Sequence, residues 1–137
     1  MLALGSKVLD RPQDLEVAIR LAETCYWSYR ITMTGIGAEE VWFKIMEEGN
    51  LKNNNNPEIH KRHPDGIIRL GPSYYLLRPE TIESLFILYR VTGDKKYQEH
   101  AWEIWQSIEK WCKTSTGYSG IYDVDSTSII KNDSMER

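Results

Sequence analysis

The sequence has few of the residues and segments that define several large classes of protein. It contains only two cysteines, Cys25 and Cys112, which cannot form a disulfide framework and leave one bridge possible. It has no run of 18 apolar residues, so no segment is long enough to span a bilayer as a helix. The apolar stretch at the very start is also too short for a signal peptide. Composition therefore leaves the compartment open.

The charge balance is close to neutral, with 17 basic and 20 acidic residues and a net charge of −3. Nucleic-acid and anionic-membrane partners favour clustered basic residues, and we therefore predict no nucleic-acid partner and no membrane contact by this segment. The sequence also has no Gly-rich phosphate loop, no Walker pattern and no plausible Ser-His-Asp set. Its chemistry must come from other residues.

What the sequence does have is a core and many aromatic side chains. Its 137 residues are 41% apolar, which predicts one domain able to bury roughly two-thirds of its unfolded surface. Five Trp, eight Tyr and two Phe are many for this length. Aromatic side chains build cores, and they also form platforms for sugar rings.

Hydrophobic spacing predicts one long amphipathic helix from a cap at Asp10, with Pro12 in its first turn, to about Met33. We assign no element to residues 1–9. Residues 38–45 are a strand or irregular, 47–66 a loop, and 67–70 a short extended piece. The apolar stripe of the long helix is expected at Leu15, Ala18, Ala22, Cys25, Tyr26 and Tyr29.

A second helix is predicted from Pro79 to Gly93, and a third follows a cap at Asp94. Helices joined by so short a turn pack antiparallel as a hairpin. Residues 114–134 are a loop or a short β-hairpin, and His100 is expected to be half-exposed. The buried face of the third helix is expected to contain Tyr97, Ala101, Ile104, Trp105, Ile108, Trp111 and Cys112, and Trp102 is assigned to the core as well.

The start of the second helix carries the residues best suited to chemistry. Glu80 and Glu83 lie on one face, about 5–6 Å apart at Cβ. The positive end of the helix dipole, with Arg78 nearby, keeps Glu80 ionised, so it could position a water or a sugar hydroxyl. The alternative is that the two acids only complement the dipole and Arg78 only balances charge. Local pattern alone favours this second interpretation.

Three other patterns carry weaker hypotheses. His60 and His63 with Asp65 could hold a metal, but they lie in an Asn-rich loop without a cysteine partner. Asn132 begins a glycosylation triplet of a kind that also occurs by chance. A helix, a Gly-Asp turn and a second helix also occur in tetratricopeptide-type repeats, which bind peptides, but no second copy is present.

Taken together, five stretches resemble the class I α-1,2-mannosidases, family 47 of the glycoside hydrolases, of the endoplasmic-reticulum type. They occur in the family's order across nearly the whole chain. The matching stretches are residues 22–26 (AETCY), 34–39 (TGIGAE), 75–85 (YLLRPETIESL), 88–98 (LYRVTGDKKYQ) and 133–136 (DSME).

This resemblance implies an all-α fold, a barrel of seven antiparallel helix pairs, (α/α)7, with calcium at its floor. It implies inverting hydrolysis of terminal α-1,2-linked mannose on high-mannose N-glycans in the endoplasmic reticulum or Golgi lumen. Inversion needs an acid and a base about 6.5–9.5 Å apart. Glu80 matches the candidate general base, and Glu39 an acid sometimes assigned as proton donor. Arg78 and Glu83 match residues of the sugar and calcium pocket.

The departures from the family are as informative as the matches. The chain resembles only the C-terminal third of the family domain, and the threonine that binds calcium directly has no counterpart, so no metal ligand is assigned. Ala38 stands where the family has proline, and Cys25 should be unpaired because its family partner would precede Met1. We therefore expect residues 1–137 to be one incomplete domain, inactive alone, whose partner is the missing part of the barrel. The alternative is a non-catalytic module, either a mannose-recognising remnant or a helical-hairpin adaptor.

Overall fold

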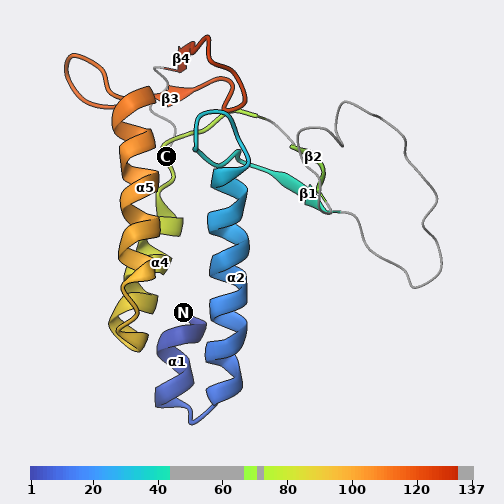
Figure 1. Ribbon diagram of the computed structural model, residues 1–137, viewed down its shortest axis with the longest axis vertical. Coiled ribbons are helices and arrows are strands. Elements are labelled where there is room, and N and C mark those ends of the chain that lie inside the picture. The colour runs from blue at the N-terminus through green and yellow to red at the C-terminus, as the bar shows by residue number, and fades with distance from the viewer. Residues whose placement is uncertain (44–66, 71–72, 133–137) are drawn as a thin grey trace, which may run out of the picture.

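The computed structural model describes residues 1–43, 67–70 and 73–132. These residues form two helix hairpins side by side, with short strands gathered at and beyond one end (Figure 1). The prediction of helix hairpins with short β segments is confirmed. The elements are α1 (Leu2–Val8), α2 (Pro12–Arg30), β1 (Val41–Phe43), β2 (Ile67–Leu70), α4 (Glu80–Thr92), α5 (Lys96–Trp111), β3 (Gly120–Ile121) and β4 (Lys131–Asn132). Within this described part, no helix is both long and apolar enough to cross a bilayer.

Helix α1 corrects the assignment of no element to residues 1–9. It is seven residues long, too short to be stable without packing. Its small side chains Ala3 and Ser6 are buried, which lets its backbone lie close to α2 and α4. The Ser6 hydroxyl donates back to the Ala3 carbonyl oxygen at 2.8 Å, so the buried polar group is satisfied. The helix therefore depends on tertiary contacts that local sequence does not display.

Helix α2 follows the predicted stripe with three differences. Arg11, not Asp10, occupies the cap, and Asp10 adopts a left-handed φ of 51°. The helix ends at Arg30 instead of Met33, because the chain turns into a loop that carries buried polar groups. Cys25 is exposed and unpaired, so it lies off the buried stripe. Ala22, Tyr26 and Tyr29 are buried as expected.

Helices α4 and α5 are joined where the sequence predicts. Gly93 has a left-handed φ of 76° and donates its N–H to the Tyr89 carbonyl oxygen at 2.8 Å, which ends α4. Pro79 is the N-cap of α4 and not its first residue, so the helix begins at Glu80, one residue later than predicted. Asp94 also precedes the cap of its helix, which is Lys95, although its Oδ1 still accepts the Lys96 N–H at 3.0 Å.

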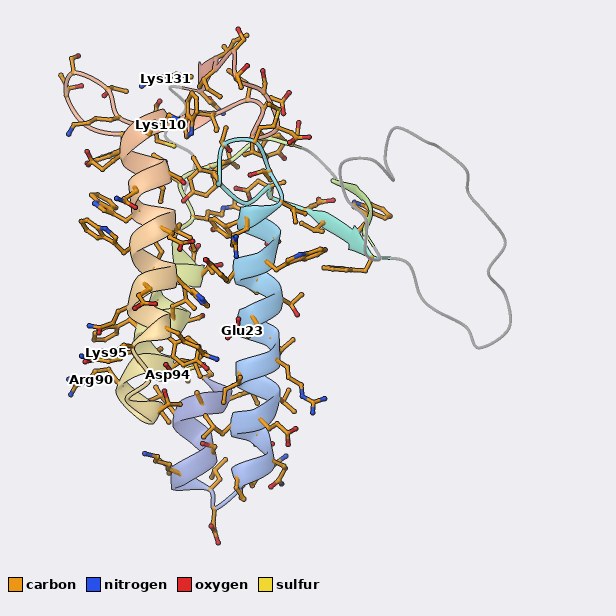
Figure 2. All side chains as sticks on the ribbon, viewed as in Figure 1. Glu23, Arg90, Asp94, Lys95, Lys110 and Lys131 are labelled. Atoms are coloured by element: carbon orange, nitrogen blue, oxygen red, sulfur yellow. The ribbon has the colours of Figure 1, made fainter. Side chains whose placement is uncertain are left out.

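The two hairpins are joined by polar contacts between α2 and α5. The Tyr26 hydroxyl donates to Glu103, and the ring of His100 stacks on the Tyr26 ring with centroids 3.6 Å apart. Glu23, labelled on α2 in Figure 2, forms an ion pair of 2.9 Å with Lys96. His100 is half-buried, as expected.

The tryptophans of α5 correct the predicted core. Trp102 is 60% exposed and Trp105 38% exposed, because both lie to one side of the face that α5 turns inward. Tyr97, Ile104 and Ile108 form that face, together with the fully buried Cys112. The two tryptophans instead line an apolar groove of about 360 Å³ between α4 and α5. The other residues lining the groove are Ile82, Phe86, Tyr89, Tyr97, Gln98 and Ala101.

The strands pair as two short antiparallel ribbons, β1 with β2 and β3 with β4. Strand β2 coincides with the predicted extended piece at residues 67–70, and the β3–β4 ribbon confirms the short hairpin in 114–134. Tyr75 forms a bridge to Ile121, with two backbone hydrogen bonds of 2.9 and 3.0 Å. A Cβ on Gly120 would lie 2.5 Å from the Tyr75 carbonyl oxygen, so a side chain there would break this contact. The bridge ties the segment before α4 to the C-terminal ribbon.

Candidate active site

The loop that follows α2 is built around two buried threonine hydroxyls. Thr34 Oγ1 donates to the Val124 carbonyl oxygen at 2.7 Å. The Thr32 hydroxyl and the Thr34 hydroxyl each lie 3.2 Å from the Ile36 nitrogen, whose N–H they accept. Because its polar groups are paired, the loop can bury Ile36 completely. It forms a fixed support for Glu39, three residues further on.

Gly35 and Gly37 let this loop lie close to its neighbours. Gly35 has a left-handed φ of 70°, and a Cβ there would lie 2.5 Å from Ser107 Oγ on α5. A Cβ on Gly37 would lie 2.6 Å from Cε2 of the buried Tyr29 ring. Side chains at these two positions are thus excluded by contact with α5 and with α2.

Glu39 is held from three directions by the segment that precedes α4. Its Oε1 accepts the Leu76 N–H at 2.9 Å, and its Oε2 forms an ion pair of 2.8 Å with Arg78 Nη1. Its own N–H donates to the Tyr74 carbonyl oxygen at 3.1 Å. Only 10% of the Glu39 side chain is exposed, against 56% for Arg78. The structure thus joins two predicted site residues that are 39 positions apart in the chain.

The contacts of the Glu39 carboxylate with the Leu76 N–H and with Arg78 are called the clasp below. Leu77 lies between these two partners and has a left-handed φ of 57°. A bulky residue in this region is a genuine outlier, with a cost of about 1–3 kcal/mol. Such a conformation persists only where the surrounding contacts determine it. Here those contacts are the Glu39 bonds to Leu76 and to Arg78, one on each side of Leu77.

Glu80 and Glu83 are exposed in the first turn of α4. The guanidinium expected beside Glu80 instead forms its ion pair with Glu39. The charge of Glu80 acts on a different neighbour, the phenol of Tyr29. Burial raises the pKa of Tyr29, the Thr81 hydroxyl opposes that rise, and the charges of Glu80 and Glu39 add to it. The charges of both predicted catalytic carboxylates therefore act in the same direction on the pKa of Tyr29.

Sequence reasoning missed Tyr29 and the backbone of Leu76 as parts of this site. The one signal for Tyr29 was its position on the apolar stripe of α2, which predicts a core residue and nothing more. Gly37 was a second signal, since a glycine in a buried loop indicates that another group lies close to its backbone, which here is the Tyr29 ring. No local pattern indicates that the Leu76 N–H binds a side chain 37 residues away.

The described residues do not form a metal centre by themselves. Among them, no group of three or more His, Cys, Asp or Glu side chains could hold an ion. His60, His63 and Asp65 lie outside the described residues, so that hypothesis stays a prediction. Asn132, the first residue of the glycosylation triplet, is buried in β4 and pairs with Gly120.

Comparison with known proteins identifies this architecture. The sequence profile of glycosyl hydrolase family 47 matches residues 1–137, and the chain belongs to that family. A solved structure, the alpha-1,2-mannosidase from Trichoderma reesei, superposes with a TM-score of 0.80 at 35% identity. The match covers 91% of this chain and 26% of that one, and it confirms the predicted fold, part of an (α/α)7 barrel.

Curated relatives agree. A mannosyl-oligosaccharide 1,2-alpha-mannosidase of Arabidopsis thaliana, MNS3, is 39% identical over 127 residues, which are 90% of this chain and 20% of the relative. The human mannosyl-oligosaccharide 1,2-alpha-mannosidase IC is 35% identical over 131 residues, 93% of this chain and 18% of that protein. The chain thus spans about a fifth of the length of these relatives.

Proposed function

We propose that this chain supplies one part of the active site of a mannosyl-oligosaccharide 1,2-alpha-mannosidase. The reaction is the inverting hydrolysis of terminal α-1,2-linked mannose on high-mannose N-glycans. The observation that carries the proposal is the clasp of Glu39 and Arg78 beside the first turn of α4, in a chain whose relatives are named for this activity. The endoplasmic reticulum or Golgi lumen is the proposed location, because that is where such glycans are trimmed.

Glu80 is the proposed general base. An inverting glycosidase needs a carboxylate on the face opposite the leaving group to activate water. Glu80 is exposed, so water can reach it, and it lies in the first turn of α4, where the helix dipole favours the anion. Arg78 is half-exposed and keeps donors beyond the one that binds Glu39, which suits it to hold sugar hydroxyls. Glu83 lies on the same helical face and would complete this wall of the sugar site.

Calcium is proposed on family resemblance. Calcium takes six to eight oxygen ligands, and the first turn of α4 offers carboxylates of the right chemistry in Glu80 and Glu83. Two exposed carboxylates are too few for such a shell, and the described part of the chain gathers no third one beside them. The described residues therefore do not make a calcium site alone.

The proposed partner is the remainder of an (α/α)7 barrel. In a closed ring of helix hairpins each hairpin packs against a neighbour on both sides, and this chain matches about a quarter of the Trichoderma chain. The groove that contains Phe86, Trp102 and Trp105 is the kind of apolar surface that a further helix hairpin covers. Without that cover we expect no turnover by the 137-residue chain.

A chimera tests the proposal. Residues 1–137 replace the matching quarter of the Trichoderma enzyme, and release of mannose from an α-1,2-linked oligosaccharide is measured, with the anomer followed by NMR. We expect release with inversion, and a loss of about 10²–10⁴-fold in turnover for Glu80→Gln, the typical contribution of a general base or acid. Glu99→Gln is the matched control, because Glu99 is a glutamate in the first turn of α5.

Each result discriminates. A folded chimera without activity, or one in which Glu80→Gln and Glu99→Gln have the same activity, contradicts the proposal. Mannose binding without hydrolysis, lost in Arg78→Ala, would favour the non-catalytic remnant instead. Turnover by the 137-residue chain alone, abolished by Glu80→Gln, would contradict the requirement for the rest of the barrel.

A further inference from the structure

The role of Glu39 follows from where its two carboxylate oxygens are used. Oε1 accepts from the Leu76 N–H and Oε2 from the Arg78 guanidinium, and nine-tenths of the side chain is buried. A proton donor must hold its proton on an oxygen that faces the leaving group of the substrate. In Glu39 both oxygens already accept bonds from groups of this chain, so neither is directed at a substrate. The geometry is that of a carboxylate used as an anchor.

What the anchor holds is the strained turn that leads into α4. Leu77 adopts its left-handed conformation between the two groups that Glu39 binds. Two residues later, the Pro79 carbonyl oxygen accepts the Ile82 N–H at 2.9 Å in the first turn of α4. The direction in which that turn presents Glu80 depends on the path of residues 76–79. Releasing Glu39 would therefore release both the Arg78 guanidinium and the entry to α4.

We propose that Glu39 is a positioning residue, which clasps Leu76 and Arg78 to hold the strained turn at Leu77 and thereby orients Arg78 and Glu80. The inference refines the proposed function, because it removes Glu39 from the role of proton donor and assigns that role to a carboxylate elsewhere. The clasp itself can be measured without sugar or turnover. Failure of the glycosidase proposal and failure of the clasp are therefore separate results.

The first measurement is amide hydrogen exchange of the 137-residue chain by NMR. Glu39→Ala removes both bonds and should speed exchange at Leu76 by about tenfold or more, with a smaller increase at Ile82. Glu39→Gln keeps an oxygen for the Leu76 N–H and loses the charge, so protection of Leu76 should be largely restored. Tyr75 is the internal reference, because its N–H bonds to the Ile121 carbonyl oxygen and not to Glu39.

The second measurement separates anchoring of Arg78 from simple support of the backbone. The guanidinium N–H signals of Arg78 should be resolved in the wild-type chain and should broaden or exchange rapidly in both Glu39 variants. Glu39→Gln then gives a split result, with Leu76 protected and Arg78 released. Glu40→Ala and Glu40→Gln are matched controls, since Glu40 is the exposed neighbouring glutamate, and they should change neither signal.

A third variant tests the strain. Glycine at position 77 can adopt the left-handed φ without strain. In the Leu77→Gly background, Glu39→Ala should therefore increase the exchange rates of the Leu76 and Ile82 amides by smaller factors than it does in the wild type. Wild-type protection of Leu76 in Glu39→Ala would overturn the proposal, as would unchanged Arg78 signals in Glu39→Gln. Equal effects of the Glu39 and Glu40 substitutions would also overturn it. If Glu39→Ala also exposes Tyr75, the whole segment before α4 has opened, and the split result in Glu39→Gln decides.

Discussion

Substituting Gly37 by alanine tests how closely the loop after α2 is seated on the Tyr29 ring. A Cβ at this position would lie 2.6, 2.8 and 3.0 Å from three ring atoms of Tyr29. Contacts this short force one of the two groups to move. The ring is only 7% exposed, so it has little room to turn aside. Either the loop lifts or the ring shifts, and both disturb the packing next to Glu39.

The expected magnitude follows from two opposing effects. Forcing one methyl group into a filled core costs about 1–3 kcal/mol. Replacing glycine by alanine also restricts the unfolded chain, which returns about 0.4–1 kcal/mol. The net expectation is a loss of about 0–2.6 kcal/mol in the free energy of unfolding, with a central value of about 1.3 kcal/mol. At Gly117 a Cβ would meet nothing within 4 Å, so Gly117→Ala should be neutral or stabilising by about 0.4–1 kcal/mol.

Urea unfolding followed by circular dichroism measures both variants, and thermal unfolding checks them at roughly 3–5 °C per kcal/mol. A third chain, Tyr29→Leu, removes the ring edge that Gly37 faces, so adding Gly37→Ala there should cost clearly less than in the wild type. Equal stability of Gly37→Ala and Gly117→Ala would refute the reasoning. So would a cost of Gly37→Ala that is unchanged when Tyr29 is leucine.

Three further predictions concern other groups. Burial, with a smaller contribution from Glu103, raises the pKa of Tyr26 to about 12 from its ordinary 10. The stability that the Tyr26 hydroxyl contributes should be complete below pH 10 and lost as the pH rises to 12, and this loss should be absent in Tyr26→Phe. Exposed Cys25 should react with a thiol reagent in the folded chain. Cys112 is fully buried, and burial raises the pKa of its thiol to about 11, so it should react only on unfolding. Mass spectrometry of the labelled peptides measures both reactions. In the active chimera, Glu39→Gln should lower turnover while both limbs of the pH profile remain, and loss of the alkaline limb would identify Glu39 as the proton donor after all.

The helices were predictable where the residues that start or end a helix agree with the hydrophobic periodicity. Pro12 opens α2 and Gly93 closes α4 through local backbone effects that need no tertiary contact. Helix α1 has neither a cap nor a long stripe, and it exists because Ala3 and Ser6 are small enough to pack closely. Local sequence contains the first kind of information and omits the second.

The sequence predicts which residues form the candidate site, but not the contacts between them. The stretch around Glu80 was visible because the residues that start a helix are neighbours in sequence. The partner of Arg78 was not, because Glu39 reaches it across 39 positions and through a turn that leucine rarely adopts. The expectation of an Arg78–Glu80 pair relied on proximity in sequence, and the ion pair with Glu39 replaced it.

The tryptophans of α5 show why a correct pattern can still predict the wrong core. Hydrophobic periodicity indicates which side chains of a helix are apolar and share a face, and it does not indicate which element covers them. Two apolar faces are present on α5, and α2 and α4 can cover only one of them here. Tyr97, Ile104 and Ile108 occupy the covered face, while Trp102 and Trp105 line the open groove. The error in the predicted core and the proposed barrel partner therefore have one cause, because a helix with apolar residues on two sides is built to lie between two neighbours.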